Sequence, residues 1–358
     1  MNLLRIILFP FSLLYGLVIL LRNRFFDWGI LPSKSYPFPV ISVGNLSVGG
    51  TGKSPHVEYL VRLLQNDFKL ATLSRGYKRK TSGFLLAGDN PKVEDFGDEP
   101  CQFARKFPEV KVAVDEKRAR GINILSNKFP DLDVVVLDDA FQHRHVKPGL
   151  SVLLTDYHRL YSNDYPLPTG KLREFGSGAK RADIIVVTKT SNVLSPITQR
   201  NVKESLKIQP YQKIYFSHIK HGKLKPLPGL DISPSGSRFA MILMFAGIAN
   251  TYPLEDHLKK FCGQLETLIF PDHHQYVLKD VEKIVNIFDN LLSKNKIIVT
   301  TEKDAMRLIR PEFIKILKHF PVFYVPIEIE FHKEGRKEFN KQILDYVKEN
   351  RRNNEIRK

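Results

Sequence analysis

Apolar residues along the chain recur with two periods, one typical of strands and one typical of helices. Six short runs rich in Val, Ile and Leu have the composition of buried strands; they span residues 39–43, 69–74, 110–114, 134–137, 152–155 and 184–188. Between the first two runs, Val57, Leu60, Val61 and Leu64 follow the i, i+3, i+4, i+7 spacing of a helix that buries one face. Because strand runs alternate with helical patterns, we predict an α/β fold with a parallel sheet wrapped by helices.

A second set of strand and helix patterns follows a polar stretch rich in Pro and Gly at residues 222–237. Its expected elements are strands at 239–246, 266–270, 296–300 and 322–329, a helix near 279–293 and an amphipathic tail helix from about 334. At ~150 residues per domain, 358 residues also favour two domains. We therefore predict an N-terminal helix over 1–25, a first α/β domain over 26–225 and a second, smaller α/β domain over 238–350.

The N-terminal segment is uncharged and mostly apolar over residues 6–21. Arginines flank it at Arg5, Arg22 and Arg24. The segment is shorter than the ~20 residues that a helix needs to cross a bilayer, and Pro10 and Gly16 interrupt it. Bulky and charged residues follow Leu21, where a cleaved signal peptide would have small ones. We predict a membrane-associating helix that dips into the interface, with a signal peptide and a buried helix as the alternatives.

Composition narrows the class of protein without identifying a partner. The chain has 55 Lys and Arg against 38 Asp and Glu, a net charge of +17, and 42% of its residues are hydrophobic. This composition is ordinary for a globular chain and excludes disorder throughout. Cys101 and Cys262 lie far apart without metal-ligand spacing, which argues against a disulfide framework or a zinc site and favours a reducing compartment. The positive charge fits nucleic acid, anionic lipid or phosphorylated substrates alike.

The strongest chemical signal comes directly after the first predicted strand. The candidate phosphate-binding loop comprises Ser47, Val48, Gly49, Gly50, Thr51, Gly52, Lys53 and Ser54. Glycines let backbone N–H groups turn toward phosphate oxygens, a lysine reaches the β and γ phosphates, and a hydroxyl holds Mg²⁺. Ser47 replaces the usual first glycine. The alternative is a glycine-rich turn, but a strand before the loop and a helix after it favour phosphate binding.

Two adjacent aspartates follow another buried run. Asp138 and Asp139 end the run at 134–137, so they are expected at the carboxyl edge of the sheet, where ligands bind in open α/β folds. In P-loop enzymes an acidic residue at this edge binds Mg²⁺ directly or through water. The alternative is a pair of aspartates that only caps a turn.

These signals indicate a nucleotide but do not identify the reaction. The Asn-Lys-x-Asp signature of guanine specificity is absent after the late strand, where residues 188–190 read Thr-Lys-Thr, so a GTPase is disfavoured. A kinase needs a base near the acceptor hydroxyl. Asp98, in the turn at residues 97–100, is a candidate, although such a turn is usually only a surface feature.

An ordered set of motifs points to one family. The motifs are GNLSVGGTGKSP at 44–55, SRGY at 74–77, GDEP at 97–100, LDDAFQH at 137–143, LRE at 172–174, DHH at 272–274 and TEKD at 301–304. Their order and spacing resemble those of the tetraacyldisaccharide 4'-kinases, the membrane-associated lipid A kinases of Gram-negative bacteria. The resemblance covers essentially the whole chain.

The resemblance implies a P-loop NTPase-like domain with an N-terminal membrane anchor and a second lobe that closes over the active site. It implies transfer of the γ-phosphate of ATP, with Mg²⁺, to the 4'-hydroxyl of a tetraacylated glucosamine disaccharide 1-phosphate in lipid A biosynthesis. The partners would be this acylated disaccharide lipid and the cytoplasmic face of the bacterial inner membrane. We expect no nucleic-acid partner, and a monomer.

The resemblance also implies roles for individual residues. Lys53 would steady the β and γ phosphates, Asp98 would take the proton from the sugar hydroxyl, and His273 would orient and tune Asp98. The acidic and hydroxyl groups of the metal and nucleotide site would be Ser54, Glu99, Asp138, Asp139 and Glu174. Without the resemblance His273 would be interpreted as structural.

Departures from the family pattern and two rival functions remain. Ser54 replaces the commoner Thr, Ala140 replaces Gly, and Phe175 replaces Pro. The cations at residues 78–80 are a hypothetical contact for the substrate phosphate or lipid headgroups, or are merely solvated. The first rival is a membrane-tethered ATPase or GTPase that acts as a switch or chaperone and needs neither Asp98 nor His273. The second, a nucleic-acid-dependent ATPase, is supported only by the charge.

Overall fold

The protein is described by a computed structural model that covers residues 3–89, 91–234, 236–272 and 274–355. The chain divides into two compact units. The first comprises Met1–Ile219 and Ile329–Lys358, and the second comprises Lys220–Glu328. Each unit has its own sheet and its own hydrophobic core.

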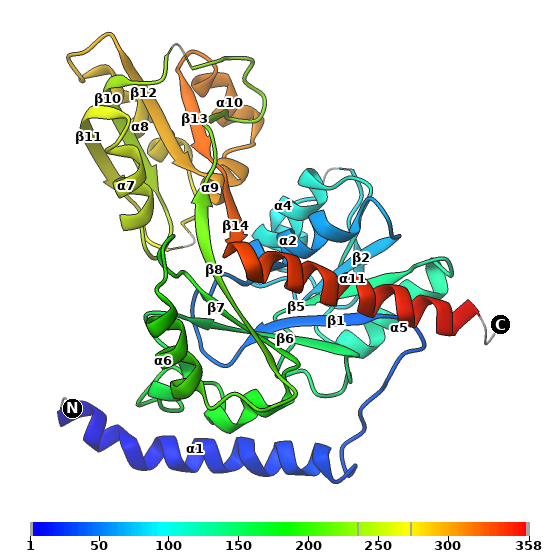
Figure 1. Ribbon diagram of the computed structural model, residues 1–358. Coiled ribbons are helices and arrows are strands. Elements are labelled where there is room, and N and C mark those ends of the chain that lie inside the picture. The colour runs from blue at the N-terminus through cyan, green and yellow to red at the C-terminus, as the bar shows by residue number, and fades with distance from the viewer. Residues whose placement is uncertain (1–2, 90, 235, 273, 356–358) are drawn as a thin grey trace. The chain divides into compact units, whose positions relative to one another are not determined.

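The first unit contains a nine-stranded sheet of order β14-β8-β7-β6-β1-β5-β2-β4-β3 (Figure 1). Its strands are β1 (Val40–Asn45), β2 (Leu70–Ser74), β3 (Leu85–Leu86), β4 (Lys111–Val114), β5 (Val134–Asp138), β6 (Leu150–Asp156), β7 (Ile184–Thr188), β8 (Lys213–His221) and β14 (Ile327–Phe331). Neighbours from β8 through β4 pair in parallel, and the short β3 pairs antiparallel with β4. The six strands predicted for this part of the chain are confirmed.

Helices pack on both faces of this sheet. They are α2 (Lys53–Leu64), α3 (Val93–Phe96), α4 (Asp98–Lys106), α5 (Arg118–Lys128), α6 (Pro196–Leu206) and α11 (Lys333–Glu355), with 3₁₀ turns at Tyr161–Asn163 and Gly176–Arg181. Along β5, Val134 and Val136 join the core formed with α2 and α11, whereas Val135 and Leu137 join the core formed with α5. Successive strand residues point to opposite faces, so a strand covered on both sides is apolar throughout.

The order of the strands reverses direction at β1. From β1 the chain first forms β2, β4 and β5 on one side and then β6, β7 and β8 on the other. In open α/β sheets, ligands bind beyond the carboxyl ends of the strands at such a reversal. The loop at residues 46–52 follows β1, and Asp138 ends β5, so the fold brings both predicted signals to this edge.

The second unit is a smaller α/β fold with strand order β11-β10-β12-β13-β9. Its elements are β9 (Lys225–Pro226), β10 (Phe239–Ala246), α7 (Tyr252–Leu258), β11 (Cys262–Ile269), α8 (Leu278–Asp289), β12 (Lys296–Thr301), α9 (Glu302–Arg307), α10 (Pro311–Leu317) and β13 (Val322–Val325). The strands from β11 to β13 pair in parallel, and β9 pairs antiparallel with β13. The prediction of a second α/β set is confirmed.

The segment at 322–329 differs from the prediction, because it is not one strand. It forms β13 in the sheet of the second unit and the start of β14, which pairs in the sheet of the first unit. The tail helix α11 then packs Phe339, Ile343 and Val347 into the core of the first unit. The predicted limits of 26–225 and 238–350 therefore differ from the observed units, since the apolar face of the tail helix completes the first core.

The N-terminal segment forms one continuous helix, α1 (Leu3–Asp27), within the first unit (Figure 1). Neither Pro10 nor Gly16 breaks this helix, so the expectation of an interruption is wrong. A single proline removes one hydrogen bond from a long ladder, and Gly16 has a packing role against Phe175. The part of α1 from Arg5 to Asp27 is long and apolar enough to cross a membrane, by length and composition alone.

Candidate functional site

The loop after β1 has the backbone shape of a phosphate-binding loop. Gly49 and Gly52 have positive φ angles of 113° and 84°, in the left-handed region that glycine occupies without strain. An added Cβ at Gly49 or Gly50 would meet no atom within 4 Å, so the approach to the loop is open there. Helix α2 then begins at Lys53, which directs the positive end of the helix at the loop.

Side chains at the carboxyl ends of β1 and β7 hold this loop. Asn45 Nδ2 donates to Thr51 Oγ1 at 2.8 Å, and Lys53 Nζ donates to Asn45 Oδ1 at 3.3 Å. Thr188 Oγ1, at the end of β7, donates to the Thr51 carbonyl at 2.9 Å. Asn45 thus fixes both the turn and the lysine. Sequence reasoning assigned it no role, although it lies in the quoted motif at the end of the first strand.

His56 supports the loop from inside the protein. Its Nδ1 lies 2.7 Å from the Gly52 carbonyl, which only accepts hydrogen bonds, so Nδ1 carries the proton and donates. Nε2 then accepts from Ser217 Oγ at 2.9 Å. Burial lowers the pKa of His56 to about 4, because the charged ring would have no water around it. The folded protein therefore keeps His56 neutral in this arrangement.

Acidification is expected to destabilise the protein through His56. An unfolded histidine has a pKa of about 6.5, so below that pH the unfolded chain binds a proton that folded His56, with its pKa of about 4, does not. This contribution to stability is complete above pH ~6.5 and falls as the pH approaches 4, by about 2 kcal/mol at pH 5. In denaturant titrations at several pH values, the free energy of unfolding should fall less steeply with decreasing pH in His56→Gln than in the wild type. Equal slopes would contradict the assignment.

Asp138, at the end of β5, presents a carboxylate in a crowded acidic environment. It is buried, and its Oδ1 has no hydrogen-bond partner among the described residues. Burial raises the pKa of Asp138, and the negative charges of Glu99 and Asp139 raise it further. A buried carboxylate oxygen without a donor and with acidic neighbours suits a cation.

Asp139 faces two cations instead. Arg173 donates to both of its carboxylate oxygens, at 2.9 and 3.2 Å, and Lys53 Nζ lies 3.7 Å from Oδ1. Burial alone would raise the pKa of Asp139, but Lys53 and Arg173 outweigh it and lower the pKa below its ordinary value. Its φ of 49° is a strained backbone conformation for a residue with a side chain, of a kind often found at functional sites.

The turn with Asp98 lies beside the phosphate-binding loop. Asp98 and Glu99 are the first two residues of α4, and Ser54 Oγ donates to Glu99 Oε1 at 2.6 Å. Gly97 has a φ of 87°, and an added Cβ there would lie 2.7 Å from the Tyr77 carbonyl. The turn is therefore packed closely in place, and the interpretation of it as a mere surface turn does not hold.

Glu174 has protein partners on both of its carboxylate oxygens. Arg181 and Gln142 donate to Oε1 at 2.8 and 3.1 Å, and Asn23 of α1 donates to Oε2 at 2.8 Å. Glu174 is buried in this arrangement. These three partners occupy its carboxylate in this structure, and a metal-side role for Glu174 stays a prediction.

The structure describes two of three other predicted features. His273 lies outside the described residues; its neighbour His274 pairs with Asp280 at 2.8 Å. Among the cations at 78–80, Arg79 is largely buried and pairs with Glu116 at 2.6 Å, so it is not available to a headgroup. Cys101 and Cys262 are both free and buried, as the absence of a disulfide pattern predicted.

Arg118 is a buried cation beside the candidate site that sequence reasoning missed. Its guanidinium is buried and donates to the carbonyls of Asp115 and Asp138. Burial lowers the pKa of Arg118 to about 10, while Asp138 and Asp139 oppose this shift. In the sequence it lies in a charged run, which ordinarily indicates a solvated surface, so no local signal distinguishes it.

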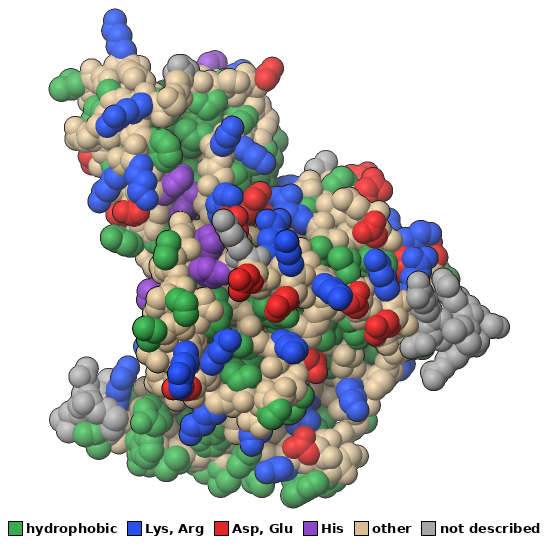
Figure 2. Space-filling view, in the orientation of Figure 1, with side chains coloured by type: hydrophobic (Ala, Val, Ile, Leu, Met, Phe, Trp, Pro, Cys, Tyr) green, Lys and Arg blue, Asp and Glu red, His purple; other side chains and the backbone are tan. Residues whose placement is uncertain are grey.

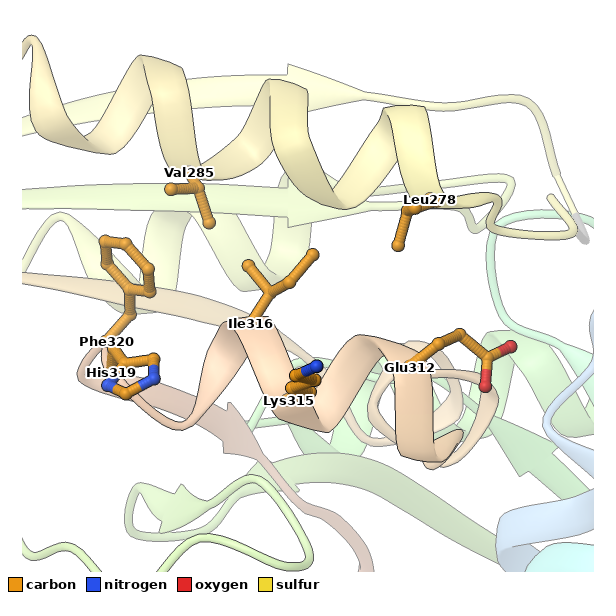
Figure 3. A pocket seen from close by; sticks show the side chains of 7 residues that line it. All are labelled: Leu278, Val285, Glu312, Lys315, Ile316, His319 and Phe320. Carbon is orange, nitrogen blue, oxygen red and sulfur yellow. The ribbon is translucent and has the colours of Figure 1, made fainter.

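The second unit also contains an apolar groove. It lies between α8 and α10 and is lined by Leu278, Val285, Glu312, Lys315, Ile316, His319 and Phe320 (Figure 3). None of the predicted site residues lines it. Its lining surface is mostly apolar and has no glycine loop, so we assign it no catalytic role.

The first unit therefore defines a P-loop nucleotide-binding protein: a glycine loop and lysine after β1, a loop hydroxyl beside a glutamate, and aspartates at the end of β5. Among the described residues, no three His, Cys, Asp or Glu side chains could hold a metal ion by themselves. In P-loop enzymes, however, the loop hydroxyl and the phosphate oxygens supply part of the coordination.

Comparison with known proteins gives the particular family. Residues 4–348 match the family model of tetraacyldisaccharide-1-P 4'-kinase. The chain is 46% identical over 358 residues to a tetraacyldisaccharide 4'-kinase of Bacteroides thetaiotaomicron, covering 97% of this chain and 94% of that one. It is also 46% identical over 357 residues to the enzyme of that name from Flavobacterium johnsoniae, covering 98% and 99%. The chain belongs to the tetraacyldisaccharide 4'-kinase family.

A solved structure agrees with this result. The crystal structure of LpxK from Aquifex aeolicus in complex with ATP has a TM-score of 0.74 to this chain and 31% sequence identity. The match covers 96% of this chain and 100% of that one. The recognition made from the ordered motifs and the predicted P-loop NTPase-like fold class are confirmed.

Proposed function

We propose that this chain uses ATP to phosphorylate the 4'-hydroxyl of a tetraacylated glucosamine disaccharide 1-phosphate, a late step of lipid A biosynthesis. The observation that carries the proposal is the contact of Ser54 Oγ with Glu99, at 2.6 Å. It places the Asp98–Glu99 turn beside the phosphate-binding loop. A switch or chaperone ATPase does not need a candidate base there, whereas a kinase does.

Lys53 and the loop would bind the nucleotide. The backbone N–H groups of residues 47–52 would surround the phosphates, and Lys53 would contact the β and γ phosphates once the nucleotide competes with Asn45 and Asp139 for it. Arg173 would then keep Asp139 in place without the lysine.

The residues present fit Mg²⁺. Asp138 has an oxygen without a donor among the described residues, and Ser54 supplies a hydroxyl next to the carboxylate of Glu99. Ser54, Asp138 and Glu99 would hold the ion directly or through water, with Asp139 nearby. The bound ion would neutralise charge on the β and γ phosphate oxygens.

Asp98 would act as the general base. The 4'-hydroxyl proton passes to the Asp98 carboxylate while the oxygen forms a bond to the γ phosphorus and the bond to the β–γ bridging oxygen breaks, so that ADP leaves. We propose that His273 orients Asp98, as the family resemblance implies.

The outer face of α1 would contact the membrane. Its exposed residues include Ile6, Ile7, Phe11, Leu13, Leu14, Leu17, Val18, Leu20, Leu21 and Phe25, followed by Trp28 and Ile30. Figure 2 shows hydrophobic side chains gathered along the edge of the molecule where Figure 1 places α1. Moving an acyl chain from a bilayer into water costs about 0.8 kcal/mol per CH₂. The tetraacylated substrate therefore stays in the membrane, and the enzyme must bind at the membrane surface to reach it. Because the phosphate donor ATP is a cytoplasmic metabolite, this surface would contact the cytoplasmic face of the inner membrane.

Transfer of label tests the function. The full-length protein with γ-labelled ATP, Mg²⁺ and detergent-dispersed tetraacyldisaccharide 1-phosphate should yield labelled lipid. The same lipid already phosphorylated at the 4'-position is the control and should stay unlabelled. Release of labelled inorganic phosphate without labelled lipid would reject the kinase and favour the tethered ATPase.

A further inference from the structure

Helix α1 has two faces of opposite character. Its buried and half-buried residues recur with helical spacing: Leu8, Phe9, Ser12, Tyr15, Gly16, Ile19, Arg22, Asn23 and Phe26. The residues between them, such as Leu14 and Val18, are exposed and apolar. A surface helix of a globular protein usually turns its apolar face inward, whereas α1 exposes large apolar side chains and turns Ser12, Tyr15 and Asn23 toward the protein.

Two of these inward groups bind the segment that carries Arg173 and Glu174. Asn23 Nδ2 donates to Glu174 Oε2 at 2.8 Å. Tyr15 OH donates to the backbone carbonyl of Arg173 at 2.9 Å. The helix therefore holds the carboxylate of one residue and the backbone of the other.

Two further contacts hold α1 in its position against the protein, near the middle of the helix. Ser12 Oγ donates to Thr169 Oγ1 at 2.7 Å and accepts from the Thr169 N–H at 2.8 Å, and both residues are buried. At Gly16 an added Cβ would lie 2.4 Å from the ring of Phe175, so only glycine permits this close approach. The contacts from Ser12 to Asn23 thus run along one side of the segment at residues 169–175.

The same segment supports the nucleotide site on its other side. The Val48 N–H donates to the Lys171 carbonyl and the Arg173 N–H donates to the Leu46 carbonyl, each at 2.7 Å. The Arg173 guanidinium contacts both oxygens of Asp139. A displacement of α1 would therefore change both the backing of the loop and the position of Asp139.

We propose that α1 is a positioning element of the phosphotransfer site in addition to its membrane contact, with Asn23 and Tyr15 as its positioning residues. The inference rests on the proposed kinase function. The α1 contacts hold the segment at residues 169–175, and this segment holds Arg173 against Asp139.

Kinetics of the full-length protein test this positioning role. Asn23→Ala should lower kcat about tenfold and Tyr15→Phe about threefold, the range expected for a lost hydrogen bond to a charged and to a neutral group. The KM for the lipid and cosedimentation with phospholipid vesicles should stay within twofold of the wild type. Asn201→Ala, at an exposed asparagine of α6, is the matched control and should retain full activity.

A double-mutant cycle locates the effect. If Asn23 acts through Glu174, then Asn23→Ala should have little additional effect on kcat in a Glu174→Gln background, whereas independent roles would give multiplied losses. Leu14→Ala with Val18→Ala, on the outer face, should show the opposite pattern: weaker cosedimentation with vesicles and unchanged exchange protection of residues 169–175.

Hydrogen exchange separates this inference from the choice of substrate. The backbone amides of residues 169–175 should exchange faster in Asn23→Ala than in the wild type, without any lipid acceptor present, while residues 239–246 serve as the internal reference. Faster exchange with no labelled lipid from the wild type would support the inference and reject the proposed acceptor. Unchanged kcat and unchanged exchange in both Asn23→Ala and Tyr15→Phe would overturn the inference.

Discussion

Replacing Asp98 by asparagine is expected to lower kcat by about 10²–10⁴-fold, the usual contribution of a positioned general base. The amide has the size of the carboxylate but cannot take the proton of the sugar hydroxyl. The first residue of α4 is held in place, since Gly97 packs against Tyr77 and Glu99 binds the Ser54 hydroxyl. The affinity for ATP should therefore change little, which equilibrium binding of a labelled nucleotide would measure.

Asp95→Asn is the matched control for this experiment. Asp95 lies three residues earlier, in α3, and its backbone carbonyl rather than its side chain accepts the bond from Thr81. Its variant should keep kcat within about twofold of the wild type, as is usual for a change outside the machinery. If Asp98→Asn kept more than a tenth of the wild-type kcat, another group would have to be the base.

The fold of the first unit could be predicted because its strands are covered on both faces. Such strands appear as continuous apolar runs, and the helix between them shows its own period, so both signals are local. The strand at 213–221 was missed because its apolar run is only three residues long and is followed by a stretch that contains Ser, His and Lys, so it lacks the continuous Val, Ile and Leu run of the central strands. The return of residues 329–355 to the first unit was also missed, since that packing depends on contacts distant in the sequence.

The candidate site was predictable as far as its residues lie in motifs with a known mechanism. The glycine loop, Lys53 and Asp138 belong to local patterns whose chemistry requires those residue types. The roles of Asn45 and Arg118 depend on which strand ends become neighbours, and a single sequence does not contain that information. The partners of Glu174 could not be predicted either. The apolar composition of the N-terminal segment indicates contact with lipid, and no local pattern indicates that Asn23 faces the protein.

Replacing Asp304 by alanine is expected to destabilise the second unit by about 3–5 kcal/mol, the usual cost of breaking a buried ion pair. Asp304 is fully buried and accepts from Thr301 Oγ1 at 2.7 Å, from the Gly247 N–H at 3.0 Å and from Arg307 at 2.9 Å. Alanine removes the carboxylate from a buried guanidinium and from a buried backbone donor, and neither gains water in exchange.

The contacts of Asp304 explain why this loss should extend through the unit. Gly247 follows β10, and Thr301 ends β12, so one carboxylate connects the carboxyl ends of two adjacent strands to α9. Hydrogen exchange should rise across Lys220–Glu328 in Asp304→Ala, and denaturation followed by circular dichroism should give the energy. Asp231→Ala, at an exposed loop position of the same unit, should change stability by no more than about 0.5 kcal/mol. A loss of equal size in both variants would mean that burial of the carboxylate, and its link between β10 and β12, contributes nothing specific.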